Sequence, residues 1–391
     1  MHDNLQPTYL DWAATAPQKP PINYNYQLGN PSSIHDLGRN QKSTLQNSRE
    51  VIANLFNCSP EEIIFTSGAT ESNNLIMYAV LSKINNKSDS NFNREILQSA
   101  LEHPSVSEPA RQLKLMGFPV KTIPSNSNGL INLDKTNDQL SEKTNLVSIT
   151  SINNETGAIQ PISEVINLVK AYSTKIGHPI HFHTDAVQAF CKGINIPFFL
   201  SDSCAVSGHK IGSHTGVGAL LIRSTANITP LSGGGNQENG FRSGTENVSG
   251  IFSFAKCAAL SSRQSINNLH HAKSLYEQLY SEVEKIGIEI VPSARHSNPE
   301  NYSPYIICLS APTIPSEVIV RILSDNGIYV SRGSACSSSS KPSPVLMAMK
   351  TPIQIGKSAF RISTGWETTS NDIDKLINIL TKHVLKLRSE I

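Results

Sequence analysis

The fold can be predicted outward from the stretch Ser207-Gly208-His209-Lys210, which directly follows apolar, β-favouring residues ending at Val206. The preceding segment 181–188 carries Asp185 and, three residues later, Gln188. A lysine amine can hold an aldehyde as an imine, and a nearby carboxylate can keep a pyridine nitrogen protonated. Pyridoxal phosphate (PLP) chemistry needs both protein groups. A single lysine motif is more often a solvated surface residue, so this interpretation depends on the rest of the chain.

Composition and charge exclude several classes of protein. The chain has 391 residues, with 38% hydrophobic and 16% charged residues, which is enough for one large domain and a smaller one. The formal net charge of +2 and the absence of a Lys/Arg block argue against nucleic-acid binding. No run approaches about 18 apolar residues, so we expect no membrane span. The first four residues are neither basic nor apolar, which predicts a cytoplasmic protein.

The six cysteines are scattered, without a C-x-x-C pair, which favours free thiols in a reducing compartment. Five of them are expected to be small buried hydrophobic residues: Cys58, Cys191, Cys204, Cys257 and Cys308. The sixth, Cys336, lies in the Gly/Ser/Pro-rich segment 333–344, which offers little apolar surface for burial. We therefore expect Cys336 to be accessible for thiolate chemistry.

A strand at 62–66 is expected to break at the turn 67–72 and to continue into a helix with an apolar stripe from Leu75 to Ile84. A strand, a glycine-containing turn and a helix start can cradle a phosphate on free backbone N–H groups. Simple N-capping by Ser or Thr is the structural alternative. From this segment alone both interpretations stay open, and the pattern is not that of a P-loop.

Other polar residues follow predicted strands. His103 comes after the strand 96–99, where an imidazole can stack on a cofactor ring and move protons, although a lone histidine is more often structural. Asn153 begins the polar stretch 153–157 after the strand 146–152. Such positions at the carboxyl ends of strands bind ligands in open α/β sheets. Strands alternate with helices as far as Lys210, which predicts a largely parallel, doubly wound sheet.

The remaining sequence predicts a second, α+β domain. Glycines 233–235 followed by Arg242 and Ser243 are compatible with an anion-binding loop or a plain linker. One helix is expected over 250–263 and a second one over about 272–286, stopped by Gly287. Arg361 lies on the short strand 360–363, where its guanidinium could clamp a carboxylate or form a surface ion pair. We assign residues 19–256 to the large domain, and residues 1–18 with 257–391 to the small one.

In combination these segments resemble the cysteine desulfurases of the NifS/IscS type, in the class V branch of fold-type I PLP enzymes. The resemblance covers nearly the whole chain. It rests on six motifs, at residues 65–75, 153–157, 184–188, 207–210, 242–245 and 333–336.

The resemblance implies roles for the matching residues around PLP. Lys210 would form a Schiff base with the cofactor and later move protons, and His103 would stack on the pyridine ring. Asp185 would keep the ring nitrogen protonated, and Gln188 would hydrogen-bond the phenolic oxygen. Phosphate contacts would come from four residues of the same subunit and one of a second subunit: Ala69, Thr70, Ser207 and His209, with Thr245 from the second subunit.

The resemblance also implies the reaction. Asn153 and Arg361 would hold the carboxylate of L-cysteine, and Cys336 would take its sulfur as a persulfide while L-alanine is released. The long loop around Cys336 would carry sulfur to an acceptor protein, for iron–sulfur cluster assembly or another use. A homodimer is implied by the role of Thr245.

The chain departs from the family pattern in two places, and several alternative functions remain open. Residues 211–216 replace the Gly-Pro-Lys-Gly turn of many relatives, and the chain ends without the longer tail that docks an iron–sulfur scaffold in some. A selenocysteine or cystine lyase would use the same pocket, whereas an aminotransferase would need no loop cysteine. From another class, a metal-binding protein could use His178, His181 and His183, but no cysteine or carboxylate set completes a ligand shell.

Overall fold

The computed structural model describes residues 7–19, 28–79, 94–226, 228–230, 233–332 and 342–389. A seven-stranded sheet has the order β2-β8-β7-β6-β5-β3-β4. Its strands are β2 (Ile63–Thr66), β3 (Glu95–Ser99), β4 (Val120–Ile123), β5 (Thr144–Ser148), β6 (His181–Asp185), β7 (Ser203–Ser207) and β8 (Gly218–Ile222). Strands β3 to β7 pair in parallel, and β8 is antiparallel to both β7 and β2. The predicted largely parallel sheet is confirmed.

The reversal at β8 follows from the chain length available after β7. Only residues 208–217 separate the two strands, and a parallel crossover needs a dozen residues or more. The connection is therefore tight, and it contains Lys210 in a short 3₁₀ turn (Gly208–Ile211). The lysine is placed at the carboxyl end of a fully buried central strand.

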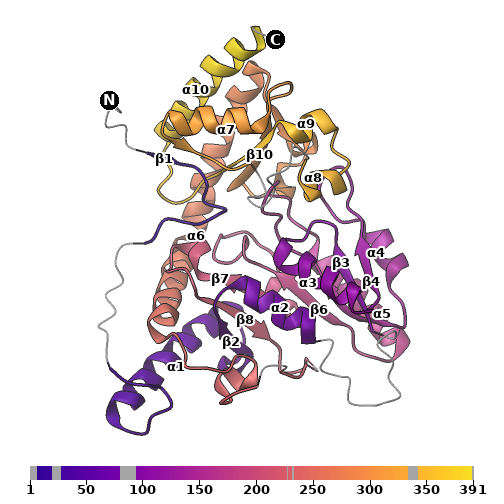
Figure 1. Ribbon diagram of the computed structural model, residues 1–391, viewed down its shortest axis with the longest axis vertical. Helices are drawn as coiled ribbons and strands as arrows, with labels where there is room; N and C mark the ends of the chain where they lie inside the picture. Colours follow the sequence, from indigo (N-terminus) through magenta and orange to yellow (C-terminus); the bar gives the residue numbers. More distant parts are fainter. Residues whose placement is uncertain are drawn as a thin grey trace.

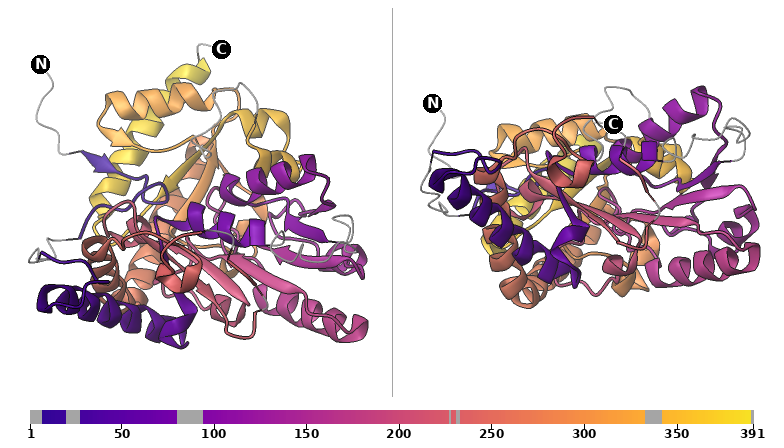
Figure 2. Two further views of the ribbon diagram at one scale, coloured as in Figure 1. Left: turned by 60° about the horizontal axis from the view of Figure 1, so that its bottom comes forward. Right: turned by 90° about the horizontal axis from the view of Figure 1, so that it is seen from below.

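Both faces of the sheet are covered by helices, as Figures 1 and 2 show. Alternate strand residues point to opposite faces: Phe65 packs with α1 (Asp36–Phe56), whereas Ile64 packs with α2 (Ala69–Ala79). The first face is also covered by α5 (Ile162–Ile176) and α6 (Val248–Val283), and the second by α3 (Pro104–Leu115). The short helix α4 (Leu133–Gln139) packs near β4 and α5.

A smaller sheet lies above the main one in Figure 1. It has the antiparallel order β12-β10-β9, and β1 pairs with β11 nearby in parallel. These strands are β1 (Thr8–Tyr9), β9 (Glu289–Val291), β10 (Ile306–Ser310), β11 (Ile328–Tyr329) and β12 (Ala359–Ser363). The helices are α7 (Ser316–Asp325), α8 (Pro344–Ala348), α9 (Ile353–Lys357) and α10 (Ser370–Ser389). A separate apolar core joins these sheet strands to α7, α10 and the C-terminal half of α6.

The helix α6 corrects one prediction. The sequence led us to expect two helices, over 250–263 and 272–286, but α6 is one helix of 36 residues. Residues 264–271 contain neither Gly nor Pro, so nothing interrupts the helical backbone there. The domain boundary expected after residue 256 falls inside this helix, and α6 runs from the large sheet to the small one (Figure 1).

The N-terminal strand β1 is short. It ends at Tyr9, and Asp11 adds an isolated parallel bridge to Ser363. The backbone N–H groups of Ala14 and Thr15 then turn back to the carbonyl oxygen of Asp11. This turn carries the chain into the ligand-binding region. In the described part of the chain, no helix is long and apolar enough to cross a membrane.

Candidate active site

A cavity of about 520 Å³ lies at the carboxyl ends of β5, β6 and β7 and is bordered by the N-terminal turn. Ligands bind at this edge in open α/β sheets. The lining includes nine of the twelve residues expected at the site: Ala69, Thr70, His103, Asp185, Gln188, Ser207, His209, Lys210 and Arg361.

Lys210 has no carboxylate as a hydrogen-bond partner among the described residues. Its Nζ donates to the carbonyl oxygens of Ala13 and Ala14, both at 2.7 Å. Burial, and next the positive charge of Arg361, lower the pKa of Lys210 to about 8. At this pKa about one amine in ten is neutral at pH 7, far more than for an ordinary lysine, and only the neutral amine can form an imine.

Asp185 belongs to a buried hydrogen-bond network. Its Oδ2 accepts from Nδ2 of Asn73 at 2.8 Å, and its Oδ1 accepts from the backbone N–H of Val187 at 3.0 Å. Asn73 is fully buried, and its Oδ1 lies 2.9 Å from Nε2 of His183. Burial lowers the pKa of His183 to about 3, so this imidazole is neutral and donates from Nε2 to Asn73. The amide of Asn73 is thereby oriented with its donor toward Asp185.

His103 lies at the end of the same network. Its backbone is extended (φ −65°, ψ 152°) and caps α3, as expected for a residue before proline. Nδ1 accepts from the backbone N–H of Ser105 at 3.1 Å and lies 2.9 Å from its Oγ. The neutral ring therefore carries its proton on Nε2. Burial lowers the pKa of His103, Asp185 opposes this shift, and Lys210 adds to it.

The start of α2 lines one side of the cavity. Ala69 and Thr70 are its first residues, and the first N–H groups of a helix have no acceptor within the helix. Gly68, Ser207 and His209 line the cavity too. Burial, and next the charge of Lys210, lower the pKa of His209 to about 4, so His209 is a neutral hydrogen-bonding group.

Arg361 is buried and lines the cavity. Its Nη2 donates to Oδ1 of Asp11 at 2.6 Å, and its Nη1 donates to the carbonyl oxygen of Asn154 at 2.8 Å. Its Nε N–H is buried and has no hydrogen-bond partner in the part of the chain that the structure describes. The exposed-ion-pair alternative does not apply, because the Arg361 side chain is only 4% exposed.

The position of Asn153 conflicts with its expected contact with a carboxylate. Its Oδ1 accepts from the backbone N–H groups of Glu155 and Thr156 at 3.0 and 2.9 Å, and its Nδ2 donates to the carbonyl oxygen of Leu101 at 3.1 Å. The side chain thus holds the 153–157 turn together, as Asn does when it bonds to nearby backbone. Its neighbour Asn154 lines the cavity instead.

Sequence reasoning assigned no role to three groups in this region. Glu102 lines the cavity, and burial raises its pKa to about 8. Its Oε2 is buried and has no hydrogen-bond partner among the described residues. Burial also raises the pKa of Glu155, which likewise lines the cavity. Asp11, the third group, follows the N-terminal strand β1. Nothing in the residues around Asp11 predicts that its side chain bonds Arg361, which is 350 positions later in the chain.

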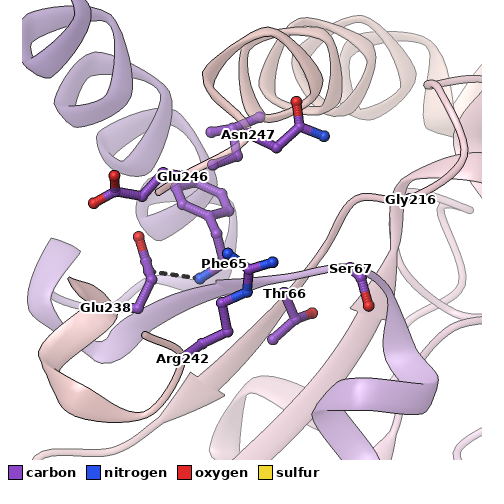
Figure 3. A pocket seen from close by; sticks show the side chains of 9 residues that line it. Phe65, Thr66, Ser67, Gly216, Glu238, Arg242, Glu246 and Asn247 are labelled. Carbon is purple, nitrogen blue, oxygen red and sulfur yellow. Dashed lines mark hydrogen bonds between the residues drawn. The ribbon is translucent and has the colours of Figure 1, made fainter. Parts of the chain in front are cut away.

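Thr245 does not line this cavity and is exposed. It lies beside a second, small pocket, shown in Figure 3, that shares Ser67 and Gly216 with the large one. There Glu238 accepts from the backbone N–H of Phe65 at 2.7 Å. Arg242 is paired with Glu71 at 3.5 Å. The negative charge of Glu71 therefore disfavours the predicted binding of an anion by Arg242.

The expected nucleophile, Cys336, lies outside the described residues. The other five cysteines are free, three of them buried and Cys58 and Cys191 half-buried. Burial raises the pKa of Cys191 and of Cys308 to about 12, and that of Cys58 to about 11. These thiols stay protonated and are poor nucleophiles.

The metal-binding alternative gains no support from the described part of the chain, which contains no group of three or more His, Cys, Asp or Glu able to hold a metal. His181 and His183 do share a strand face, but both face the hydroxyl of Ser203, at 2.7 and 2.8 Å.

The groups present fit PLP. A buried amine with a lowered pKa suits the aldehyde, and a buried carboxylate held by two donors suits a protonated pyridine nitrogen. The start of α2 suits the phosphate. These three groups line one cavity.

Comparisons with known proteins agree with this geometry. The Aminotransferase class-V family model matches residues 8–376. A cysteine desulfurase IscS from Dictyoglomus turgidum is 36% identical over 391 residues, covering 97% of this chain and 95% of the relative. A NifS/IcsS protein homolog from Lactobacillus delbrueckii subsp. bulgaricus is 35% identical, covering 94% and 95%.

Solved structures give the same result. A NifS-like protein has a TM-score of 0.86 at 32% identity and covers 99% of this chain and 100% of its own. A NifS-like protein from Rickettsia africae has a TM-score of 0.82 at 31% identity, covering 97% and 100%. This chain therefore belongs to the NifS/IscS cysteine desulfurases of the class V aminotransferase family, which are PLP-dependent enzymes.

Proposed function

We propose that the chain converts L-cysteine to L-alanine and transfers the sulfur to Cys336. The observation that carries this proposal is the single cavity in which the Lys210 amine, the Asp185 carboxylate and the Arg361 guanidinium all lie. These groups suit an aldehyde, a pyridine nitrogen and a substrate carboxylate, respectively.

In this proposal Lys210 holds PLP, Asp185 pairs with its ring nitrogen, and His103 stacks on its ring. Gln188 contacts its phenolic oxygen. The phosphate is held by the start of α2 with Ser207 and His209. When bound, PLP supplies an electron sink that makes the Cβ–S bond of cysteine labile. The amine of Lys210, once neutral, can take up and return a proton at the substrate carbon.

Arg361 orients the substrate by its carboxylate. A guanidinium binds a carboxylate with two parallel hydrogen bonds, which sets direction as well as affinity. We assign the neighbouring amide contact to Asn154 and not to Asn153, because Asn154 lines the cavity and the Asn153 side chain is used within its own turn.

Sulfur transfer is assigned to Cys336. Its thiolate attacks the substrate sulfur, an S–S bond forms as the Cβ–S bond breaks, and the carbon takes up a proton to give alanine. The described residues on both sides of segment 333–341 adjoin the site. Ser331 exchanges backbone hydrogen bonds with Arg361 at 3.2 and 2.7 Å, and the Ser343 hydroxyl bonds to Glu155.

Several finer assignments complete the proposal. We propose a homodimer in which Thr245 of one subunit reaches the phosphate of the other, since Thr245 does not line the cavity of its own subunit. We also propose a cytoplasmic enzyme that passes sulfur to an acceptor or iron–sulfur scaffold protein. The large domain would comprise residues 19–256, and residues 1–18 with 257–391 the small one.

Alanine formation from L-cysteine tests the function, with PLP-loaded wild type compared with Cys336→Ala. We expect the variant to keep its yellow cofactor band but to lose most alanine production. Mass spectrometry of the wild type should find one extra sulfur on Cys336. Cys191→Ala is the matched control and should keep its activity. A Cys336→Ala protein as active as wild type would show that the thiol is dispensable and would favour the lyase alternative.

A further inference from the structure

Arg361, the residue assigned to the substrate carboxylate, already holds a carboxylate of its own chain. Oδ1 of Asp11 accepts from Nη2 at 2.6 Å, although the two residues are 350 positions apart in the sequence. Nη1 donates to the carbonyl oxygen of Asn154 at 2.8 Å, and among the described residues the buried Nε has no hydrogen-bond partner.

The unpaired Nε and the Asp11-bound Nη2 lie on the same edge of the guanidinium. A carboxylate that binds this edge bidentately accepts from both nitrogens. An incoming substrate carboxylate therefore finds Nε unpaired but has to share Nη2 with the carboxylate of Asp11. Two carboxylates at one guanidinium repel each other in a buried site.

We propose that Asp11 is a specificity-determining residue, because it occupies the carboxylate site of Arg361 and must be displaced by the substrate. This inference rests on the proposed role of Arg361. An α-amino acid has a second anchor, its amine, which the cofactor can hold, whereas a simple carboxylate has only Arg361. Asp11 thus weakens the binding of amino acids and of simple carboxylates, but it excludes only the simple carboxylates. A competing charge of this kind is a common means of discrimination between ligands.

The peptide segment around Asp11 makes displacement observable. Its carbonyl oxygen accepts from the N–H groups of Ala14 and Thr15, so residues 11–15 form one turn. The next residue, Trp12, is buried, and its ring centroid is 4.6 Å from that of Trp366. The chain has only these two tryptophans. Movement of Asp11 is therefore expected to change the intrinsic fluorescence.

The experiment uses PLP-loaded protein and titrates propionate, a carboxylate without amine or thiol, with propionamide as the neutral control ligand. Tryptophan fluorescence reports binding, and isothermal titration calorimetry gives the same affinity without relying on the tryptophans. Variants are Asp11→Asn, Arg361→Gln and, as a matched control, Asp372→Asn. Asp372 accepts a hydrogen bond from Oγ1 of Thr8 at 3.1 Å, and Thr8 belongs to the same N-terminal segment as Asp11. The carboxylate that Arg361 bonds is that of Asp11.

We expect Asp11→Asn to bind propionate about five- to tenfold more tightly than wild type, with no change for propionamide and none in Asp372→Asn. Arg361→Gln should lose propionate binding. If Arg361→Gln loses binding but Asp11→Asn binds equally or more weakly, Asp11 supports Arg361 and the inference is overturned. If Arg361→Gln binds as tightly as wild type, the proposed carboxylate site itself is wrong, and the inference fails with it.

Discussion

The Nζ of Lys210 lies 2.7 Å from the carbonyl oxygen of Ala13, which is 197 positions earlier in the chain. The same carbonyl oxygen accepts from Nε2 of Gln188 at 3.0 Å. Two residues assigned to the cofactor are thus oriented by one peptide group of the N-terminal turn. A carbonyl oxygen carries no full charge, so it positions the lysine amine without raising its pKa as a carboxylate would.

The pKa of about 8 for Lys210 predicts how fast the cofactor-free protein captures PLP at each pH. Only the neutral amine forms an imine, so the rate should rise with pH and level off above about 8. Asp11 raises this pKa by its charge, so Asp11→Asn should move the midpoint to lower pH. Stopped-flow absorbance measures the rate. A midpoint near the ordinary lysine value of 10.5 would contradict the environment described for the amine.

Glu102 predicts a pH dependence of stability. Its carboxyl ionises near 4.5 in the unfolded chain and near 8 in the folded protein, because burial disfavours the charge. Between these values the folded state binds more protons, so the free energy of unfolding falls as pH rises. Glu102→Gln removes this loss and should gain on the order of 2–4 kcal/mol over wild type between pH 5 and pH 8.

Urea denaturation of both cofactor-free proteins across this pH range measures the difference. Glu108→Gln is the matched control, since Glu108 lies on the exposed face of α3 with 54% of its side chain exposed. The control should follow wild type at each pH. An unchanged pH profile for Glu102→Gln would show that the carboxyl ionises normally.

We predict a large effect on stability for Arg295, which does not line the cavity. It is 1% exposed and donates to the carbonyl oxygens of Ile306, Ser303 and Thr156, at 2.7, 2.7 and 3.3 Å. Arg295→Met leaves these buried carbonyl groups without their donor and should lower the free energy of unfolding by about 2–4 kcal/mol. Arg263→Met, on the exposed surface of α6, should change it by less than about 0.5 kcal/mol. Equal melting of the two variants would rule out this role.

We predict that Asn73 affects the affinity for the cofactor, although its side chain does not line the cavity. Asn73→Ala removes one donor from Asp185 and another from Ser105, whose hydroxyl it contacts at 2.8 Å. Loss of a hydrogen bond to a charged group should weaken PLP binding about tenfold. Asn74→Ala is the control, because Nδ2 of Asn74 contacts only carbonyl oxygens, those of Thr70 and Ser105. Its PLP dissociation constant, measured by equilibrium dialysis, should stay within about twofold of wild type. The same loss in both variants would mean that α2 as a whole, and not this network, holds Asp185.

The local elements were predictable because their signals lie in consecutive residues. The strand at 63–66, the following turn and the start of α2 are contiguous, and so are β7 and the Lys210 turn. Errors occurred where the signal was weak or absent. Two apolar stripes were taken for two helices although no breaker separates them, and Asn153 and Asn154 are alike in sequence but face different surroundings.

By itself, the sequence determined the strand and helix order, the PLP motifs and the residues Lys210 and Asp185, since hydrophobic periodicity and residue chemistry are written along the chain. Only the tertiary structure decided that Asp11 would occupy Arg361, that Asn73 would hold Asp185 across 112 positions, and that Glu102 would be buried without a partner for one oxygen. The physical reason is that burial and pairing depend on the packing of both sheets. Packing brings together residues that no local pattern connects.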